Sequence, residues 1–280
     1  MSEIQKIKAK LKPNESLDEL FSRSKLISTG PDFKKMLDFV SRFKSYKPYN
    51  NFLIYMQNPN CKYFATTKDW KKRFSRKPKE EARPMIILAP MHPVLFVYDI
   101  DETEGSPIPE LLSSPFEVSG KFDHTNFINL LSHLDSLNIT LHNKSLDFRH
   151  GGSIFREQKL SDPEIELNLK HAKEVNFATL VHELAHLFLG HLGSLDTETF
   201  PVRKDEVMTN KSLMEMEAES VSYLVLSRLD LETKAAEYLA FYNAQPEDLK
   251  RISMDLVLKI ATKIEAMTVK PFRYDLRLFE

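Results

Sequence analysis

Apolar residues that recur at intervals of three and four predict helices in the first part of the chain. The segments are residues 3–12, 16–28, 33–43 and 49–56, and the third carries Met36, Leu37, Val40 and Phe43 at helical spacing. Two runs rich in Ile, Leu, Val and aromatic residues follow, at 84–90 and 93–100, and they predict a pair of strands. We therefore expect a small unit of helices and strands here.

A segment rich in Pro, Ser and acidic residues, 101–115, predicts a connection between two domains. Beyond it, we expect a helix at 126–136, a short strand at 138–141 and two strands within 153–168, divided by Asp162 and Pro163. Later apolar repeats predict helices near 176–190, 211–229, 232–242 and 246–267. The expected fold is α+β: a small helical and strand domain at 1–115, then a mostly helical domain with a short β-sheet at 116–280.

Composition and charge narrow the classes of protein. No apolar run approaches the roughly 18 residues that span a bilayer, and the N-terminus is too polar for a signal segment, so we expect a cytoplasmic protein without a membrane partner. The single cysteine, Cys61, excludes an intrachain disulfide. Residues 1–85 hold 20 basic and 9 acidic residues, a balance of +11, whereas the remaining residues hold 19 and 31, a balance of -12. The basic part can meet polyanions, or it is an ordinary solvated surface.

The segment Thr179–Gly190 contains the spacing His-Glu-x-x-His, formed by His182, Glu183 and His186. Residues four apart share a helix face, so both imidazoles can bind one metal ion, for which zinc is expected. Glu183 lies about 100° round the helix, where it can act as general base toward a water molecule on the metal. The alternative is a helix with two ordinary histidines, which the apolar surroundings of the charged trio disfavour.

A third metal ligand is expected from the segment Met214–Leu224, where Glu215 and Glu219 share a helix face. Glu215 is the candidate ligand, and Glu219 can orient a ligand histidine through its other ring nitrogen. The alternative for this segment is a solvated acidic stretch. His191 is a rival ligand, but as a continuation of the helix it would point about 180° away from His182. We interpret His191 as a C-terminal helix residue beside a glycine cap at Gly190.

The sequence HELAH followed by EMEAESVSYL resembles the ImmA/IrrE-type metallopeptidases, in which HExxH precedes a helix of the form E-x-x-A-D/N-x-F-A. The resemblance covers roughly residues 150–267. It implies a zincin-like (gluzincin-like) metallopeptidase domain with zinc bound by His182, His186 and Glu215. Glu219 stands where the family usually has Asp or Asn. The implied activity is that of a zinc metalloendopeptidase that cleaves a specific partner protein, such as a repressor.

The N-terminal part is similar to the domain that precedes such peptidases in ArdC-type antirestriction proteins, through YNNFLIYMQ, FATTKDW and FVYDIDETEG. This resemblance implies binding of single-stranded DNA. Between Lys62 and Arg83, nine basic residues alternate with aromatic ones, a composition suited to phosphate contacts and base stacking, although aromatics at such spacing are more often core.

Two interpretations of function therefore stand beside each other. In the first, the protein hydrolyses a peptide bond, with Glu183 as the base and Tyr223 as a candidate donor to the oxyanion. In the second, it is a DNA-binding protection protein whose metal site is structural. A zinc hydrolase that acts on a non-peptide amide is a third alternative, which the motif does not separate from the first.

Overall fold

The computed structural model describes residues 18, 21, 27, 29–89, 94–107, 122–146, 151–157, 161–193, 201–203, 205–231 and 249–272. Within these ranges the chain is an α+β protein, as predicted. The helices expected at 3–12 and 232–242, most of the helix at 16–28, residues 246–248 and most of the connection at 101–115 lie outside the described residues.

The N-terminal part begins with two helices, α3 (Gly30–Arg42) and α4 (Pro48–Gln57). A capping box starts α3, because Thr29 and Asp32 satisfy each other's backbone N–H groups. The predicted strand pair is confirmed: β3 (Met85–Ile87) and β4 (Leu95–Asp99) are antiparallel. Strand β1 (Phe64–Ala65) pairs with the other edge of β4. Helix α5 (Thr67–Phe74) precedes a small ladder of β2 (Arg76–Pro78) with β5 (Thr103–Gly105).

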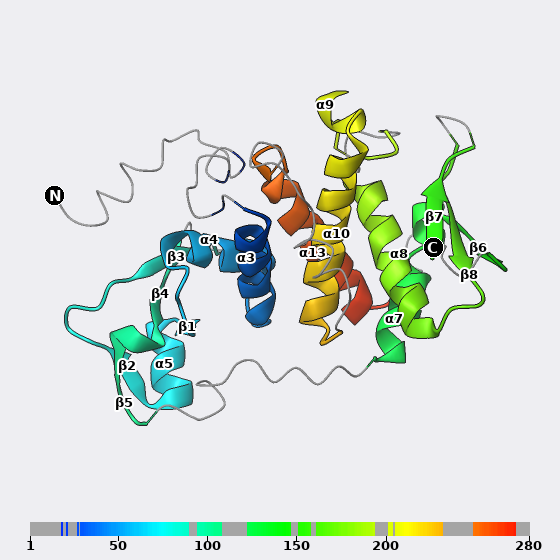
Figure 1. Cartoon of the computed structure of the whole chain (residues 1–280). Coiled ribbons are helices and arrows are strands. Elements are labelled where there is room, and N and C mark those ends of the chain that lie inside the picture. The colour runs from blue at the N-terminus through cyan, green and yellow to red at the C-terminus, as the bar shows by residue number, and fades with distance from the viewer. Residues whose placement is uncertain are drawn as a thin grey trace, which may run out of the picture.

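The C-terminal part places a three-stranded sheet beside a group of helices (Figure 1). After α7 (His124–Ser132) come β6 (Thr140–Lys144), β7 (Gly152–Phe155) and β8 (Glu164–Asn168), in the order β6-β8-β7. Strands β6 and β8 are parallel, and β7 is antiparallel to β8. The helices are α8 (Lys173–Phe188), α9 (Asp205–Met208), α10 (Lys211–Arg228) and α13 (Met254–Val269).

Helix α10 lies at the centre of the molecule, where it packs against α8, α13 and α3 (Figure 1). One cluster of buried apolar side chains extends from Phe21 to Met267, so both parts of the chain contribute to the same core. The buried guanidinium of Arg228 on α10 donates to the carbonyl oxygens of Phe43, Lys44 and Tyr46. These bonds anchor α10 to the segment that follows α3. The division into domains at residue 115 stays a prediction.

In the ranges that the structure describes, no helix combines the length and the apolar composition that crossing a bilayer requires.

Candidate metal centre

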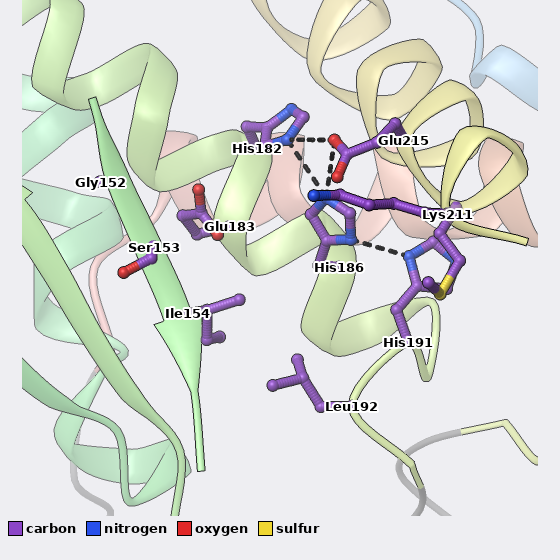
Figure 2. Close-up of a pocket in the computed structure, with 11 residues that line it drawn as sticks. Gly152, Ser153, Ile154, His182, Glu183, His186, His191, Leu192, Lys211 and Glu215 are labelled. Atoms are coloured by element: carbon purple, nitrogen blue, oxygen red, sulfur yellow. Dashed lines mark hydrogen bonds and ion pairs between the residues drawn. The ribbon is translucent and has the colours of Figure 1, made fainter. Parts of the chain in front are cut away.

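Helices α8 and α10 bring His182, His186 and Glu215 together at one pocket (Figure 2). Both histidines lie on one face of α8, while Leu180, Val181 and Leu184 are fully buried and hold the helix in the core. The Nε2 atoms of the two histidines are 3.2 Å apart. Oε2 of Glu215 lies 3.4 Å from each of them. Three potential ligand atoms therefore form a nearly equilateral triangle.

The triangle has the size that a tetrahedral zinc site requires. With ligand bonds of about 2.0 to 2.1 Å, the ligand atoms at the corners of a tetrahedron are about 3.3 to 3.4 Å apart. The three distances here, 3.2 to 3.4 Å, agree with this spacing. Two imidazoles and one carboxylate also form a donor set that leaves a fourth position for water or substrate. The residues present therefore fit a catalytic type of zinc site.

A second carboxylate from α10 orients His182. Oε2 of Glu219 lies 2.9 Å from Nδ1 of His182, on the side of the ring away from the triangle. This is the contact that the spacing of Glu215 and Glu219 predicted. Burial alone would lower the pKa of His182, but its contacts with Glu215 and Glu219 outweigh burial and raise the pKa to about 10. The contacts with both imidazoles hold the pKa of Glu215 well below its usual range.

Glu183 stands beside the triangle without belonging to it. Its carboxylate lies near the backbone N–H of Ile154 on β7, and burial raises its pKa. The approach of β7 to α8 depends on Gly152, because a Cβ atom there would lie 2.4 Å from the carbonyl oxygen of Glu166 and 2.8 Å from Cγ2 of Thr179. Glu183, the general base expected from the sequence, therefore lies on α8 where β7 approaches the helix.

His191 is not one of the three potential ligands, but its ring contacts the ring of His186 on the side opposite Nε2. Helix α8 ends in a Schellman motif: Gly190 has φ +79°, its N–H donates to Leu187, and the N–H of His191 donates to His186. The sequence predicted the glycine cap, yet the direction inferred for His191 assumed a continuing helix. The left-handed turn at Gly190 instead folds the ring back, so that its Nδ1 lies 2.9 Å from Nδ1 of His186.

A buried carboxylate that the sequence interpretation missed supports His191. Oε2 of Glu217 lies 3.0 Å from Nε2 of His191, and Nη2 of Arg203 donates to both oxygens of Glu217 at 2.7 Å. The backbone N–H of Ser253, the N-cap of α13, donates to the same carboxylate at 2.8 Å. Nothing in the spacing of Glu217 alone distinguishes it from Glu215 or Glu219; its partners come from distant segments.

Tyr223, the candidate oxyanion donor, is not brought to this pocket. Its hydroxyl donates to Asp38 on α3, because α3 packs against this part of α10.

The pocket has a volume of about 670 Å³. The described residues that line it are Gly152, Ser153, Ile154, His182, Glu183, His186, His191, Leu192, Lys211, Met214 and Glu215. Lys211 is the one lysine or arginine among them, and it precedes Glu215 by one helical turn on the same face of α10 (Figure 2).

The basic segment from Lys62 to Arg83 has exposed Lys and Arg side chains, but two of its aromatic side chains are buried. Phe64 and Trp70 are fully buried, and Nε1 of Trp70 donates to the carbonyl oxygen of Tyr98. Phe64 belongs to the main core and Trp70 to a smaller cluster with Ala65 and Ile100, so neither ring can stack on bases. Lys71, Lys72 and Arg73 on α5 are exposed, and none of them pairs with an acidic side chain of the described residues. In this segment, polyanions would therefore meet exposed cations, among them those of α5, rather than these two rings.

No family model and no curated protein matches the chain. The structure is similar to a crystal structure of the antirestriction protein ArdC from the R388 plasmid, determined in a metal-free form. The two chains share 14% identity with a TM-score of 0.39, and the likeness covers 80% of this chain and 82% of the other. Identity and TM-score are both low, so any function assigned to this chain must rest on the geometry of its own site.

Proposed function

We propose that the protein is a zinc-dependent hydrolase that cleaves a peptide bond, with the metal held by His182, His186 and Glu215. The observation that carries this proposal is the triangle of ligand atoms, 3.2 to 3.4 Å on each side, beside a buried carboxylate in an open pocket. A structural zinc site is normally closed by four protein ligands, whereas a catalytic site keeps one position open. Three ligands in a pocket therefore favour catalysis.

Zinc, when bound, supplies a Lewis acid that polarises a carbonyl group and lowers the pKa of water to about 7. Glu183 accepts the proton of the attacking water and donates it to the leaving amine. Glu183 and Ile154 both line the pocket, and the backbone N–H of Ile154 lies near the Glu183 carboxylate. The ammonium of Lys211 lines the same pocket, and within the described part of the chain no acidic side chain pairs with it. Lys211, in place of Tyr223, is then the candidate that stabilises the oxyanion.

The strand that lines one wall of the pocket favours a peptide as the substrate class. Gly152, Ser153 and Ile154 line it, and they belong to β7, which is an edge strand of the described sheet. An extended peptide can add to such an edge through backbone hydrogen bonds, which brings its carbonyl groups past the metal position. The resemblance of the HELAH and EMEAESVSYL segments to metallopeptidases that act on one protein agrees with this substrate class.

The first experiment is elemental analysis of the purified protein beside the double variant His182→Ala, His186→Ala. We expect about one zinc ion per chain in the wild type and loss of that zinc in the double variant. Glu183→Gln is the matched variant for catalysis, because it should keep the zinc and lose hydrolysis by roughly 10²- to 10⁴-fold. A wild-type protein that neither contains zinc nor takes it up would refute the proposal.

The exposed cations of α5 favour a second candidate function, binding of single-stranded nucleic acid. Each cation that contacts a phosphate makes affinity more dependent on salt, with a slope of about -0.7 per contact for single strands. Reversal of Lys71, Lys72 and Arg73 to Glu should therefore weaken binding of a labelled single strand and flatten its salt dependence. Reversal of the exposed Lys170, Lys173 and Lys259 introduces the same change of charge elsewhere and serves as the control.

The biological activity of the two sets of variants in cells distinguishes hydrolysis from nucleic-acid binding. If Glu183→Gln keeps the biological activity while reversal at α5 abolishes it, binding is the function and the metal site is structural. The opposite pattern assigns the function to hydrolysis.

A further inference from the structure

A cluster of charged and polar side chains is buried behind His186. The side chains of Glu217, His191 and Arg203 are 0%, 2% and 5% exposed. Burying charged groups is costly, and replacing a buried ion pair with apolar side chains is often neutral or stabilising. The cluster therefore calls for an explanation other than the stability of the core.

The hydrogen bonds of Glu217 determine where His191 carries its proton. The Glu217 carboxylate accepts hydrogen bonds from Nη2 of Arg203 at both oxygens and from the backbone N–H of Ser253, so a guanidinium compensates its negative charge and the carboxylate is ionised. An ionised carboxylate only accepts hydrogen bonds. The hydrogen bond between Glu217 and His191 therefore requires that Nε2 of His191 is the donor.

The contact between the two histidines extends this constraint to the metal site. Their Nδ1 atoms are 2.9 Å apart, so one proton lies between them. When Nε2 of His186 offers its lone pair to a metal ion, Nδ1 of His186 must carry that proton. Nδ1 of His191 then accepts it, which is possible because the proton of His191 resides on Nε2.

We propose that His191, held by Glu217 and Arg203, is a positioning residue that fixes the Nδ1–H tautomer and the ring orientation of His186. The inference rests on the proposed function, because it assigns His191 a role only if His186 binds a metal. With this role for His191, a carboxylate stabilises the Nδ1–H group of each of the two ligand histidines. Nδ1 of His182 faces the Glu219 carboxylate directly, and Nδ1 of His186 reaches the Glu217 carboxylate through the ring of His191.

Helix geometry explains why the second histidine needs a relay. Glu215 and Glu219 are four residues apart and share the face of α10 that meets α8. Glu217 lies about 200° round the helix from Glu215, so it faces Arg203 and the start of α13. The ring of His191, turned back by the Schellman motif, spans the distance that remains.

The test is the zinc affinity of the full-length protein, measured by competition with a chelating zinc indicator, for three variants of His191. His191→Asn keeps an acceptor at the position of Nδ1 but loses volume. His191→Phe keeps a ring but has no acceptor, and His191→Leu has neither ring nor acceptor. We expect the Phe and Leu variants to bind zinc roughly 10- to 100-fold more weakly, while the Asn variant stays within a few fold of the wild type.

A purely structural role predicts the opposite order, with Phe tolerated and Asn impaired. Unchanged affinity in the Phe and Leu variants, or that opposite order, would overturn the inference and leave the proposed function standing. Failure of the wild type to bind zinc would instead overturn the proposed function.

A direct measurement covers the case in which the variants do not fold. The ¹⁵N chemical shifts of His186 in zinc-free wild-type protein distinguish the two tautomers. We expect the proton on Nδ1, and a proton on Nε2 would overturn the inference.

Discussion

Replacing Glu217 with Ala tests how much the protein depends on the buried network. The side chain is fully buried and accepts hydrogen bonds from Arg203, His191 and the backbone of Ser253. Its removal leaves a guanidinium that is 5% exposed without its carboxylate, and it leaves the N-cap residue of α13 without its acceptor. Three elements, the turn after α8, the segment 201–203 and the start of α13, lose their common partner.

The expected cost is large because a buried charge loses its counter-charge. Breaking a buried pair by removing one partner costs about 3 to 5 kcal/mol. For 280 residues, an unfolding entropy of about 2.1 cal/mol/K per residue gives about 0.6 kcal/mol/K. The midpoint of thermal unfolding should therefore fall by roughly 5 to 8 °C. Removal of Arg203 in the same chain should recover part of the loss, since no unpaired charge then remains.

Thermal and urea unfolding, followed by circular dichroism with a chelator present, measure this change without any contribution from bound metal. Glu104→Ala is the control: Glu104 pairs with Lys77 at an exposed position, and such pairs contribute about 1 kcal/mol or less. If Glu217→Ala were no more destabilising than Glu104→Ala, the buried guanidinium of Arg203 would not need its counter-charge, and the expected cost of an unpaired buried charge would be refuted.

Three further predictions address the strand edge, the cysteine and the pocket lysine. Gly152→Ala should lower the free energy of unfolding, measured in urea, by about 1 to 3 kcal/mol, because the new Cβ would clash with Glu166 and Thr179. Gly151→Ala is the control: its Cβ would meet its nearest atom at 3.1 Å, so the loss should be smaller. Cys61 is 1% exposed and burial raises the pKa of its thiol, so an aromatic disulfide reagent should modify it only after denaturation; rapid modification of the native protein would contradict its burial. Lys211→Met should keep the zinc content and lower the rate of hydrolysis roughly 10²- to 10³-fold; an unchanged rate on a cleaved substrate would exclude Lys211 as the oxyanion partner.

Local periodicity was sufficient to predict the parts of the site that lie on single helices. The spacing of His182 and His186, and of Glu215 and Glu219, predicts shared faces because a helix repeats every 3.6 residues wherever it forms. Local composition predicted the strand pair β3 and β4, from two runs rich in Ile, Leu, Val and aromatic residues, and the glycine at position 190 predicted the helix cap.

Contacts between distant segments decided the rest. Tyr223 on α10 donates to Asp38 because α3 packs there, and Trp70 is buried although its neighbours are charged. Glu217 looks like its acidic neighbours in the sequence, yet its partners lie 14, 26 and 36 residues away along the chain. The sequence by itself determined which residues share a helix face. Only the tertiary structure decided which face meets which partner, because that choice depends on how the helices pack into one core.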